Sequence, residues 1–328
     1  MYVRAFPFLG REVKMISILF GAGASYGSEK PGIEVPPLGN NLFHELDRLG
    51  GCFNKLSEEL KSNFSAHGFE TAMLEIPNDS SILNPLQNEL ALYLSKFAPS
   101  MNSAYVRLFS KIYDINKPQL ITLNYDLLIE QSLNLCRQKI SNKTNFRPSI
   151  LKLHGSSNFI PDLGDLTFVG LKTVDCSVFI ETDGVKVIEQ HELQQWIEKH
   201  NAILSPVMCM YSKDKKMVVC PFYFNKAKRD FIKVINRTKL MVIIGTKYTP
   251  HDKHIWDVIL SNRRSRILLV DPYPDNNLKK IINIRNKKIK KNEIIEKTFY
   301  DSVDDIAKII NDEIKKTPKS INITTRIM

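Results

Sequence analysis

The segment that most constrains the fold is ISILFGAGAS, residues 16–25, in which a short apolar run is followed at once by five small residues. A buried strand that ends in small residues and turns into a helix leaves backbone N–H groups at the helix start, where they bind phosphate. The glycine spacing is G-x-G, and Gly27 stands one place later than the pattern G-x-G-x-x-G requires. The segment therefore predicts either a dinucleotide-binding turn or a glycine-rich turn before an ordinary helix.

Apolar runs that are typical of buried strands recur along the chain, at residues 16–20, 119–123, 150–153, 240–244, 266–270 and about 294–299. Segments with apolar residues at helical spacing separate them, at residues 126–140, 226–238, 251–263 and after 302. Because strands that alternate with helices form parallel sheets, the sequence predicts an α/β fold, a Rossmann-like doubly wound parallel sheet.

Two interruptions of this alternation predict the domain organisation. Residues 38–115 contain several runs at helical spacing and are predicted to be a helical insertion. Residues 156–225 are irregular, with short strands at Val185–Ile188 and Met217–Cys220 flanking a helix near Gln190–His200. The nucleotide-binding domain would then comprise residues 1–37 and 116–328, with 156–225 as an insertion within it.

Composition restricts the class of protein. The chain has 328 residues, of which 43% are hydrophobic and 25% charged, values typical of a soluble globular protein. It contains no run of 18 apolar residues, and its first 14 residues are too short and mixed for a secretory signal. The five cysteines are odd in number and never spaced C-x-x-C, which argues against a zinc ribbon or a disulfide framework. We expect a cytoplasmic protein without a membrane span, in which residues 1–14 are an arm or an over-extended start.

The net charge of +11 is concentrated in a run from Lys279 to Lys291, with seven basic residues and no acidic one. Such a run is either a surface for nucleic acid or an acidic partner, or a solvated face. No aromatic residue interrupts it, which weakens a role in stacking on bases. Nucleic-acid binding is therefore not excluded.

Small or polar residues follow five of the predicted strands, at Gly21–Ser25, Asn124–Asp126, His154–Gly155, Gly245–Thr246 and Asp271. Each alone is compatible with a helix cap, a turn or a structural histidine. Their shared position favours function, because ligands of doubly wound sheets bind at the carboxyl ends of the strands.

Four of these motifs together resemble the sirtuin superfamily: GAGAS at 21–25, TLNYD at 122–126, KLHGS at 152–156 and GT at 245–246. The closer likeness is to the sirtuin-like NAD-hydrolysing domains of bacterial antiphage defence, in which NYD replaces the QNID of deacetylase sirtuins. The motifs span about residues 16–272 and leave the helical insertion and the tail uncovered. The chain lacks the two C-x-x-C pairs of the sirtuin zinc module and any evident acyl-lysine groove motif.

The resemblance implies a role for each matching residue. The pyrophosphate would be cradled by Gly21, Ala22, Gly23, Ala24 and Ser25, with Gly245 and Thr246 on the phosphate side. Asn124 and Asp126 would lie beside the nicotinamide ribose, with His154 as general base. Asp271 would hold the adenosine ribose, where a carboxylate suits a 2′-hydroxyl and repels the 2′-phosphate of NADP. The resemblance requires no metal.

These roles predict an NAD hydrolase that releases nicotinamide and ADP-ribose and depletes NAD as an antiphage, abortive-infection effector. The alternatives are an NAD-dependent protein deacylase and a non-catalytic module that senses NAD or ADP-ribose; an ordinary dehydrogenase is less favoured because no substrate-domain signature follows. Since no sensor module is evident, we expect control in trans by a partner protein, for which the family offers a HerA-type ATPase. We also expect a homo-oligomer.

Overall fold

The computed structural model describes residues 16–77, 79–139, 146–164, 170–174, 177–182, 184–200, 203–209, 220–248, 252–286 and 293–316. Among them, a six-stranded sheet has the order β10-β9-β8-β1-β2-β3, and all its neighbouring strands are parallel. Its strands are β1 (Ile16–Phe20), β2 (Gln119–Thr122), β3 (Ser149–Lys152), β8 (Leu240–Ile244), β9 (Arg266–Val270) and β10 (Glu293–Ile295). The predicted doubly wound, Rossmann-like sheet is confirmed. The possible N-terminal arm lies outside the described residues.

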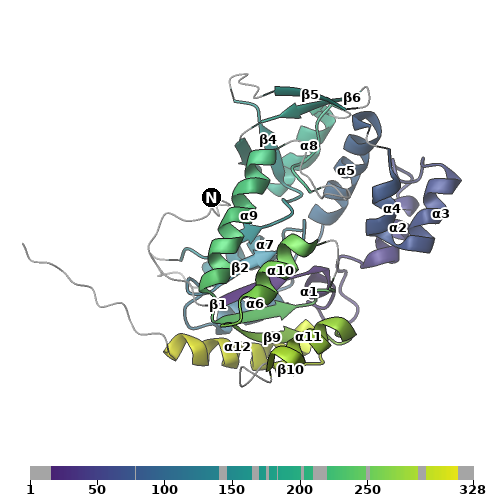
Figure 1. The fold of residues 1–328 in the computed structure, drawn as a ribbon. Coiled ribbons are helices and arrows are strands. Elements are labelled where there is room, and N and C mark those ends of the chain that lie inside the picture. The colour runs from purple at the N-terminus through teal and green to yellow at the C-terminus, as the bar shows by residue number, and fades with distance from the viewer. Residues whose placement is uncertain are drawn as a thin grey trace, which may run out of the picture.

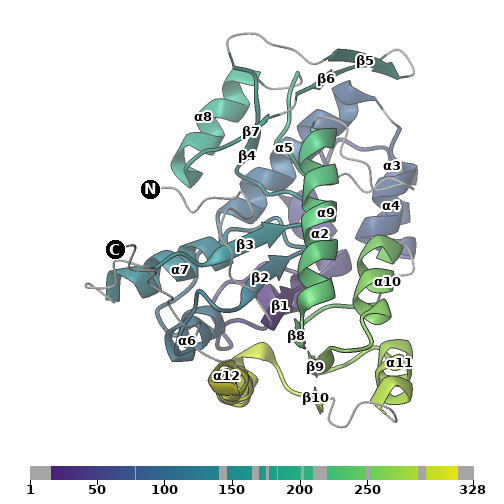
Figure 2. The same ribbon diagram turned by 60° about the vertical axis from the view of Figure 1, so that its left-hand side comes forward.

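All six strands run in the same direction, but the side of the sheet to which the chain adds strands changes between β1 and β8. This point is called the reversal below. From β1 the chain adds β2 and then β3 on one side, whereas β8, β9 and β10 follow on the other side (Figure 2). In doubly wound sheets the ligand binds outside the carboxyl ends of the strands at such a reversal. The segments that leave β1 and β8 are therefore expected to border the ligand.

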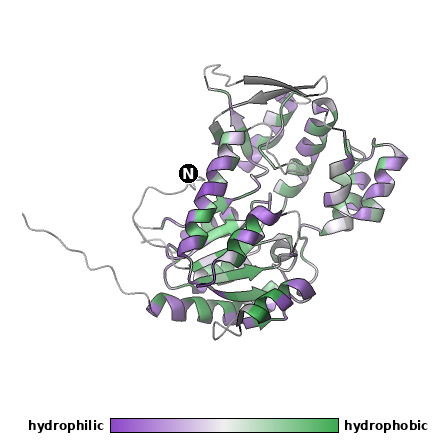
Figure 3. Ribbon diagram, in the orientation of Figure 1, coloured by the Kyte–Doolittle hydropathy of each residue, from purple (hydrophilic) through white to green (hydrophobic). Residues whose placement is uncertain are grey.

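Both faces of the sheet are covered by helices, as its apolar strands require (Figure 3). Side chains alternate between the faces, so that Ile18 and Phe20 enter one core while Leu19 enters the other. The first core includes α6 (Ala104–Lys111), α7 (Leu128–Lys139) and α12 (Phe299–Lys316); the second includes α9 (Pro221–Arg237), α10 (Lys253–Ser261) and α11 (Asn276–Asn286).

The predicted helical insertion contains α2 (Gly39–Arg48), α3 (Glu58–His67), α4 (Phe69–Glu75) and α5 (Ser80–Ser95). Helices α2, α3 and α4 gather at one side of the molecule (Figure 1), where the rings of Phe43 and Phe64 stack 4.2 Å apart. Helix α6, also within residues 38–115, packs instead against the sheet core: the Tyr105 ring lies 5.3 Å from Phe20 and 5.1 Å from Phe299.

The irregular insertion forms two small antiparallel sheets and a helix. β4 (Phe159–Asp162) pairs with β7 (Gly184–Val187), and β5 (Gly170–Val174) pairs with β6 (Ser177–Glu181). The predicted helix is confirmed as α8 (Gln190–His200), and β7 confirms the strand predicted near Val185. Most of the strand predicted at 217–220 lies outside the described residues, and Cys220 is the N-cap of α9.

In the part of the chain that the structure describes, no helix is both long and apolar enough to span a bilayer. The basic run begins on α11, where Lys279 forms an ion pair with Glu296; residues 287–292 lie outside the described ranges. Of the cysteines, Cys176 also lies outside them, and Cys52, Cys136, Cys209 and Cys220 form no disulfide with one another.

Candidate functional site

The predicted site residues all leave the same edge of the sheet, because every strand they follow is parallel to the others. Phe20 pairs with Thr122 and with Ile244, and Thr122 pairs with Lys152. Residues Gly21, Gly245 and Asp271 come one position after their strands, and Asn124 and His154 come two positions after theirs. The structure thus brings the predicted residues to one carboxyl edge, on both sides of the reversal between β1 and β8.

The glycines of the first turn are required by close packing of two backbones. The first turn leads into α1 (Ala22–Tyr26), and Gly245 follows β8 with a φ of +59°, a conformation that favours glycine. A Cβ at Gly245 would lie 2.1 Å from the Ala24 nitrogen, and one at Gly21 would lie 2.5 Å from the Gly245 oxygen. The turns after β1 and β8 therefore touch each other, which only glycine permits.

Hydrogen bonds within these turns already use several of the backbone donors that the sequence assigned to a phosphate. Gly21 N donates to Ile244 O, Gly23 N to Gly245 O and Ala24 N to Gly21 O, at 2.9–3.0 Å. Ala22 is exposed at the start of the short helix. The Thr246 hydroxyl donates back to Ile244 O at 3.3 Å. The pyrophosphate cradle stays a prediction, and the first role of these residues is to join β1 to β8.

Ser25 is the node of a buried hydrogen-bond network behind the turn. Its hydroxyl donates to Asp126 Oδ2 at 2.7 Å and accepts from Asn124 Nδ2 at 3.0 Å. Tyr105 Oη lies 3.1 Å from the same oxygen. Since Ser25 has one proton and gives it to Asp126, the Tyr105 hydroxyl must be the donor in that contact. Ser25 therefore ties α1 to the segment after β2 and to α6.

Asp126 supports the site from the protein interior. Besides Ser25, its carboxylate accepts from Leu128 N at 3.2 Å, and the ammonium of Lys152 donates to its main-chain oxygen at 2.7 Å. Burial raises the pKa of the Asp126 carboxyl, while Lys152 and the two donors act in the opposite direction. Because both carboxylate oxygens are engaged, the predicted contact with the nicotinamide ribose would have to replace one of these bonds.

The Asn124 side chain presents a single acceptor to the edge of the sheet. Its Nδ2 donates to Gly21 O at 2.9 Å as well as to Ser25. The Gly21 carbonyl can only accept, which fixes the orientation of the amide. Among the described residues, no donor reaches Asn124 Oδ1. That oxygen is the atom available to a ribose hydroxyl or a water molecule.

The segment 207–209 holds the backbone at His154. Cys209 N donates to His154 O at 2.7 Å, and Ser156 N donates to Val207 O at 3.1 Å. Between them, Gly155 has a φ of +81°, and a Cβ there would lie 1.9 Å from the Val207 oxygen. This explains the glycine of the HG motif as a close contact between two chain segments, directly beside the buried His154.

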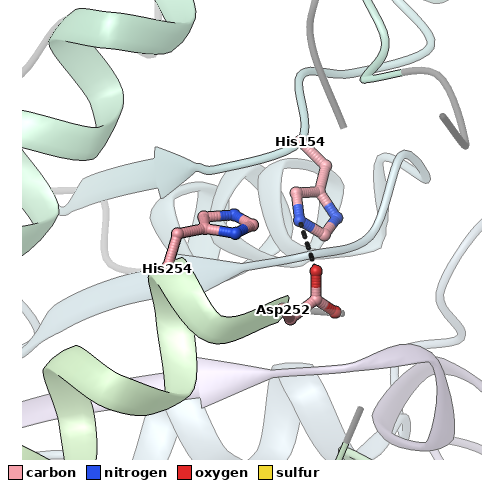
Figure 4. A group of neighbouring side chains, drawn as sticks. All are labelled: His154, Asp252 and His254. Atoms are coloured by element: carbon pink, nitrogen blue, oxygen red, sulfur yellow. Dashed lines mark ion pairs between the residues drawn. The ribbon is translucent and has the colours of Figure 1, made fainter. Parts of the chain in front are cut away.

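Sequence reasoning missed two further residues of the site, Asp252 and His254, which stand at the start of α10. Asp252 Oδ1 lies 4.0 Å from His154 Nε2 (Figure 4), and the rings of His154 and His254 are 6.2 Å apart. Asp252 occupies the N-cap position of α10 but makes no capping hydrogen bond with its side chain. The available signal was the spacing D-x-H at a helix start shortly after a strand end.

Asp271 lies on the other side of the reversal, directly after β9. Its Oδ1 accepts from Tyr273 N at 2.8 Å, and its own N–H donates to Ile295 O. Partial burial raises the pKa of the carboxyl, and the bond from Tyr273 acts in the opposite direction. Asp271 is therefore a half-buried acceptor at the edge, separated by β1 and β8 from Asn124 and His154.

Comparison with known proteins found similarity in structure alone. No protein-family model matches the sequence, and no curated protein does either. The chain is similar to a structure described as the structural basis for the mechanism and regulation of Sir2 enzymes, at 12% identity over 92% of this chain and 94% of that chain, with a TM-score of 0.46. It is also similar to a Sir2 homologue–NAD complex (13%, covering 92% and 93%, TM-score 0.41) and to Sir2Tm bound to a propionylated peptide (13%, covering 93% and 94%, TM-score 0.46).

Proposed function

We propose that this protein is an NAD glycohydrolase, which converts NAD and water into nicotinamide, ADP-ribose and a proton. The observation that carries the proposal is the buried pair of His154 and Asp252, 4.0 Å apart at the carboxyl edge where Asn124 also lies. A general base beside a charged partner is what activation of water requires. The sequence motifs that resemble sirtuin-like NAD-hydrolysing domains contain two of these three residues.

The order of strands supports one orientation for NAD. Asp271, beyond β9, would accept from the 2′-hydroxyl of the adenosine ribose. The pyrophosphate would cross the reversal beside Gly21 and Ala22, and the nicotinamide ribose would lie beyond β2 and β3, near Asn124. This orientation extends the dinucleotide along the carboxyl edge, as in other doubly wound sheets.

The proposed chemistry breaks the bond between C1′ of the ribose and the nicotinamide nitrogen. Positive charge develops on the ribose ring, as in glycoside hydrolysis, and neutral nicotinamide leaves. Water adds to C1′ and gives its proton to His154, whose cationic form is stabilised by the Asp252 carboxylate. Asn124 Oδ1 orients the ribose hydroxyl or the water, while Gly21 and Ser25 hold its amide in place.

The biological role that fits this chemistry is depletion of NAD in antiphage defence, in the cytoplasm. Such an activity has to be restrained until it is needed, so the proposal includes a homo-oligomer and a regulatory partner in trans, with a HerA-type ATPase as the first candidate. The helical insertion follows the turn at Gly21–Ser25 in the chain, so its movement could open or close the site. A partner achieves this only by binding one state more tightly than the other.

The experiment that tests the function measures nicotinamide release by the purified protein, with and without an acylated peptide. We expect release without the peptide, weak for the isolated chain and stronger when the partner is added. A strict requirement for the peptide would instead identify a deacylase, and binding of NAD without turnover in either state would identify a sensing module. Full activity of an isolated monomer at every protein concentration would contradict control in trans.

Asp271 predicts the choice of dinucleotide. The value of kcat/KM for NAD should exceed that for NADP by more than about tenfold, because a like-charge contact between the Asp271 carboxylate and the 2′-phosphate costs at least ~1.4 kcal/mol. Asp271→Asn should reduce this preference, whereas Asp257→Asn, at an exposed position of α10, should leave it unchanged. An unchanged preference in Asp271→Asn would mean that Asp271 does not face the adenosine ribose.

A further inference from the structure

Three side chains from two separate elements converge at the carboxyl edge: His154 after β3, and Asp252 and His254 at the start of α10 (Figure 4). We propose that they form a binding site for a divalent transition metal, with zinc as the preferred ion, and that the bound ion switches off NAD cleavage. The metal site stands on geometry and ligand chemistry alone. Its inhibitory effect rests on the function proposed above.

The distances fit a site that closes around an ion with small movements. One ligand atom from each residue lies within 4.8 Å of the other two. A point then exists no further than about 2.8 Å from all three atoms, whereas zinc lies at roughly 2.0–2.2 Å from nitrogen and oxygen ligands. Each ligand atom would move by less than about 1 Å. By contrast, 4.0 Å between His154 Nε2 and Asp252 Oδ1 is too long for a hydrogen bond.

The ligand types select a transition metal. Two imidazoles and one carboxylate suit zinc and its neighbours, whereas magnesium and calcium prefer oxygen ligands alone. Three protein ligands leave a fourth tetrahedral position to water, which is the arrangement of an open zinc site. This donor set contains no cysteine, so the missing C-x-x-C pairs of the sirtuin zinc module have no bearing on it.

Burial and charge favour a cation at this point. The side chains of His154 and Asp252 are 8% and 5% exposed, and a metal ion between them would be attracted by the buried carboxylate. Asp252 does not use its carboxylate to cap α10, although it stands at the N-cap position where aspartate is favoured. The carboxylate lies toward His154 instead, with Oδ1 4.0 Å from Nε2.

The surrounding structure holds the ligands in place, as a metal site of high affinity requires. The His154 backbone is fixed by Cys209 and by the close contact at Gly155. The His254 ring packs edge-on against Phe224, with ring centres 5.9 Å apart. Both histidines therefore stand on supported elements, and closure around an ion needs adjustment of side chains rather than of the backbone.

Metal binding and catalysis both use the imidazole of His154. A His154 nitrogen that ligates zinc cannot accept a proton from water, so the metal-bound site lacks its general base. Removal of the ion by a chelator returns the nitrogen to catalysis. Availability of zinc would thus regulate the proposed NAD cleavage without a change of fold.

The test is calorimetric titration of the metal-free, untagged protein with zinc chloride, followed by cobalt absorption spectroscopy of the same site. We expect one equivalent of zinc to bind, and His254→Ala and Asp252→Asn each to weaken binding by at least about tenfold. The matched control is His191→Ala, an exposed histidine on α8, which should bind zinc as the unchanged protein does. Substituted cobalt should show the intense bands of tetrahedral coordination, lost in His254→Ala.

Nicotinamide release in the presence of zinc tests the regulatory part separately. We expect zinc to inhibit the unchanged protein and a chelator to restore it, whereas the His254→Ala variant, compared with its own rate in the absence of zinc, should lose less of its turnover at the same zinc concentration. Equal zinc affinity in His254→Ala, Asp252→Asn and the unchanged protein would overturn the metal site. Zinc binding at these residues without any effect on a measurable turnover would overturn the regulation, and zinc binding without turnover in any state would count against the NAD hydrolase alone.

Discussion

Replacing His154 with alanine should lower the rate of nicotinamide release from NAD by about 100- to 10,000-fold, the usual loss when a general base is removed. The residue is buried at the carboxyl edge, with its Nε2 4.0 Å from the Asp252 carboxylate. Its main-chain bonds to 207–209 do not depend on the side chain, so the fold should persist. The rate is measured by chromatography of nicotinamide, with unfolding curves recorded in parallel.

The matched control is His191→Ala, because His191 is exposed on α8 and outside the proposed site. It should release nicotinamide at the rate of the unchanged protein. Near-normal turnover in a folded His154→Ala protein would contradict the assignment of the general base.

Asn124→Ala should cause a comparable loss of turnover, because it removes the Oδ1 acceptor. It also removes the two hydrogen bonds from Nδ2 to Gly21 and Ser25, so a loss of about 1–3 kcal/mol in the free energy of unfolding is expected. Turnover is therefore compared at a temperature where both proteins are fully folded. Retained turnover there would remove Asn124 from the reaction.

The largest effect on stability is expected for Gly245→Ala. The substitution imposes a positive φ on alanine, which costs about 1–2 kcal/mol, and places a Cβ 2.1 Å from the Ala24 nitrogen. Overpacking of a rigid backbone contact adds about 1–3 kcal/mol or more. The free energy of unfolding, measured with a chemical denaturant, should fall by at least about 2 kcal/mol more than in a control that carries the strain alone.

Gly50→Ala provides that control. Gly50 has a φ of +71°, but a Cβ there would meet no atom within 4 Å. The difference between the two variants therefore measures the contact between the turns after β1 and β8. Equal destabilisation by both substitutions would show that the turns do not touch as closely as described.

The sheet could be predicted from the sequence because its strands are short continuous apolar runs, such as LMVII at 240–244, that only burial on both faces explains. The edge that holds the site followed from the same reasoning, since parallel strands share their carboxyl ends. The small sheets β4–β7 and β5–β6 were not fully predicted. Strands of four or five residues without clear alternation carry little signal.

The residue type at a helix start did not show which hydrogen-bond partner the side chain has when two partners were possible. Ser302 is of a residue type that often caps helices, but it lies within α12 and its hydroxyl donates to Thr298 O; the Thr298 hydroxyl accepts from Asp301 N instead. Asp252 shows the reverse case: at a helix start it suggests a cap, and in the structure it lies beside His154. The spacing of residues along the chain does not show that the start of α10 lies close to the end of β3 in space.

The glycine-rich turn shows the same limit. GAGAS predicts a phosphate-binding turn by its pattern, yet the glycines are required first by contact with Gly245, which lies more than 200 residues away in the chain. Gly23 N donates to that residue and not to a ligand. A pattern of small residues shows that something approaches closely, and only the structure shows what.

The central claim is tested most directly by incubating the purified protein and its His154→Ala variant with NAD, without peptide, and quantifying both products over time. The account predicts nicotinamide and ADP-ribose in equal amounts from the unchanged protein, and a rate per protein molecule that rises with protein concentration. The variant should form neither product above background. Equal rates in the two proteins, or intact NAD in the presence of the unchanged protein at high concentration and with its partner, would contradict it.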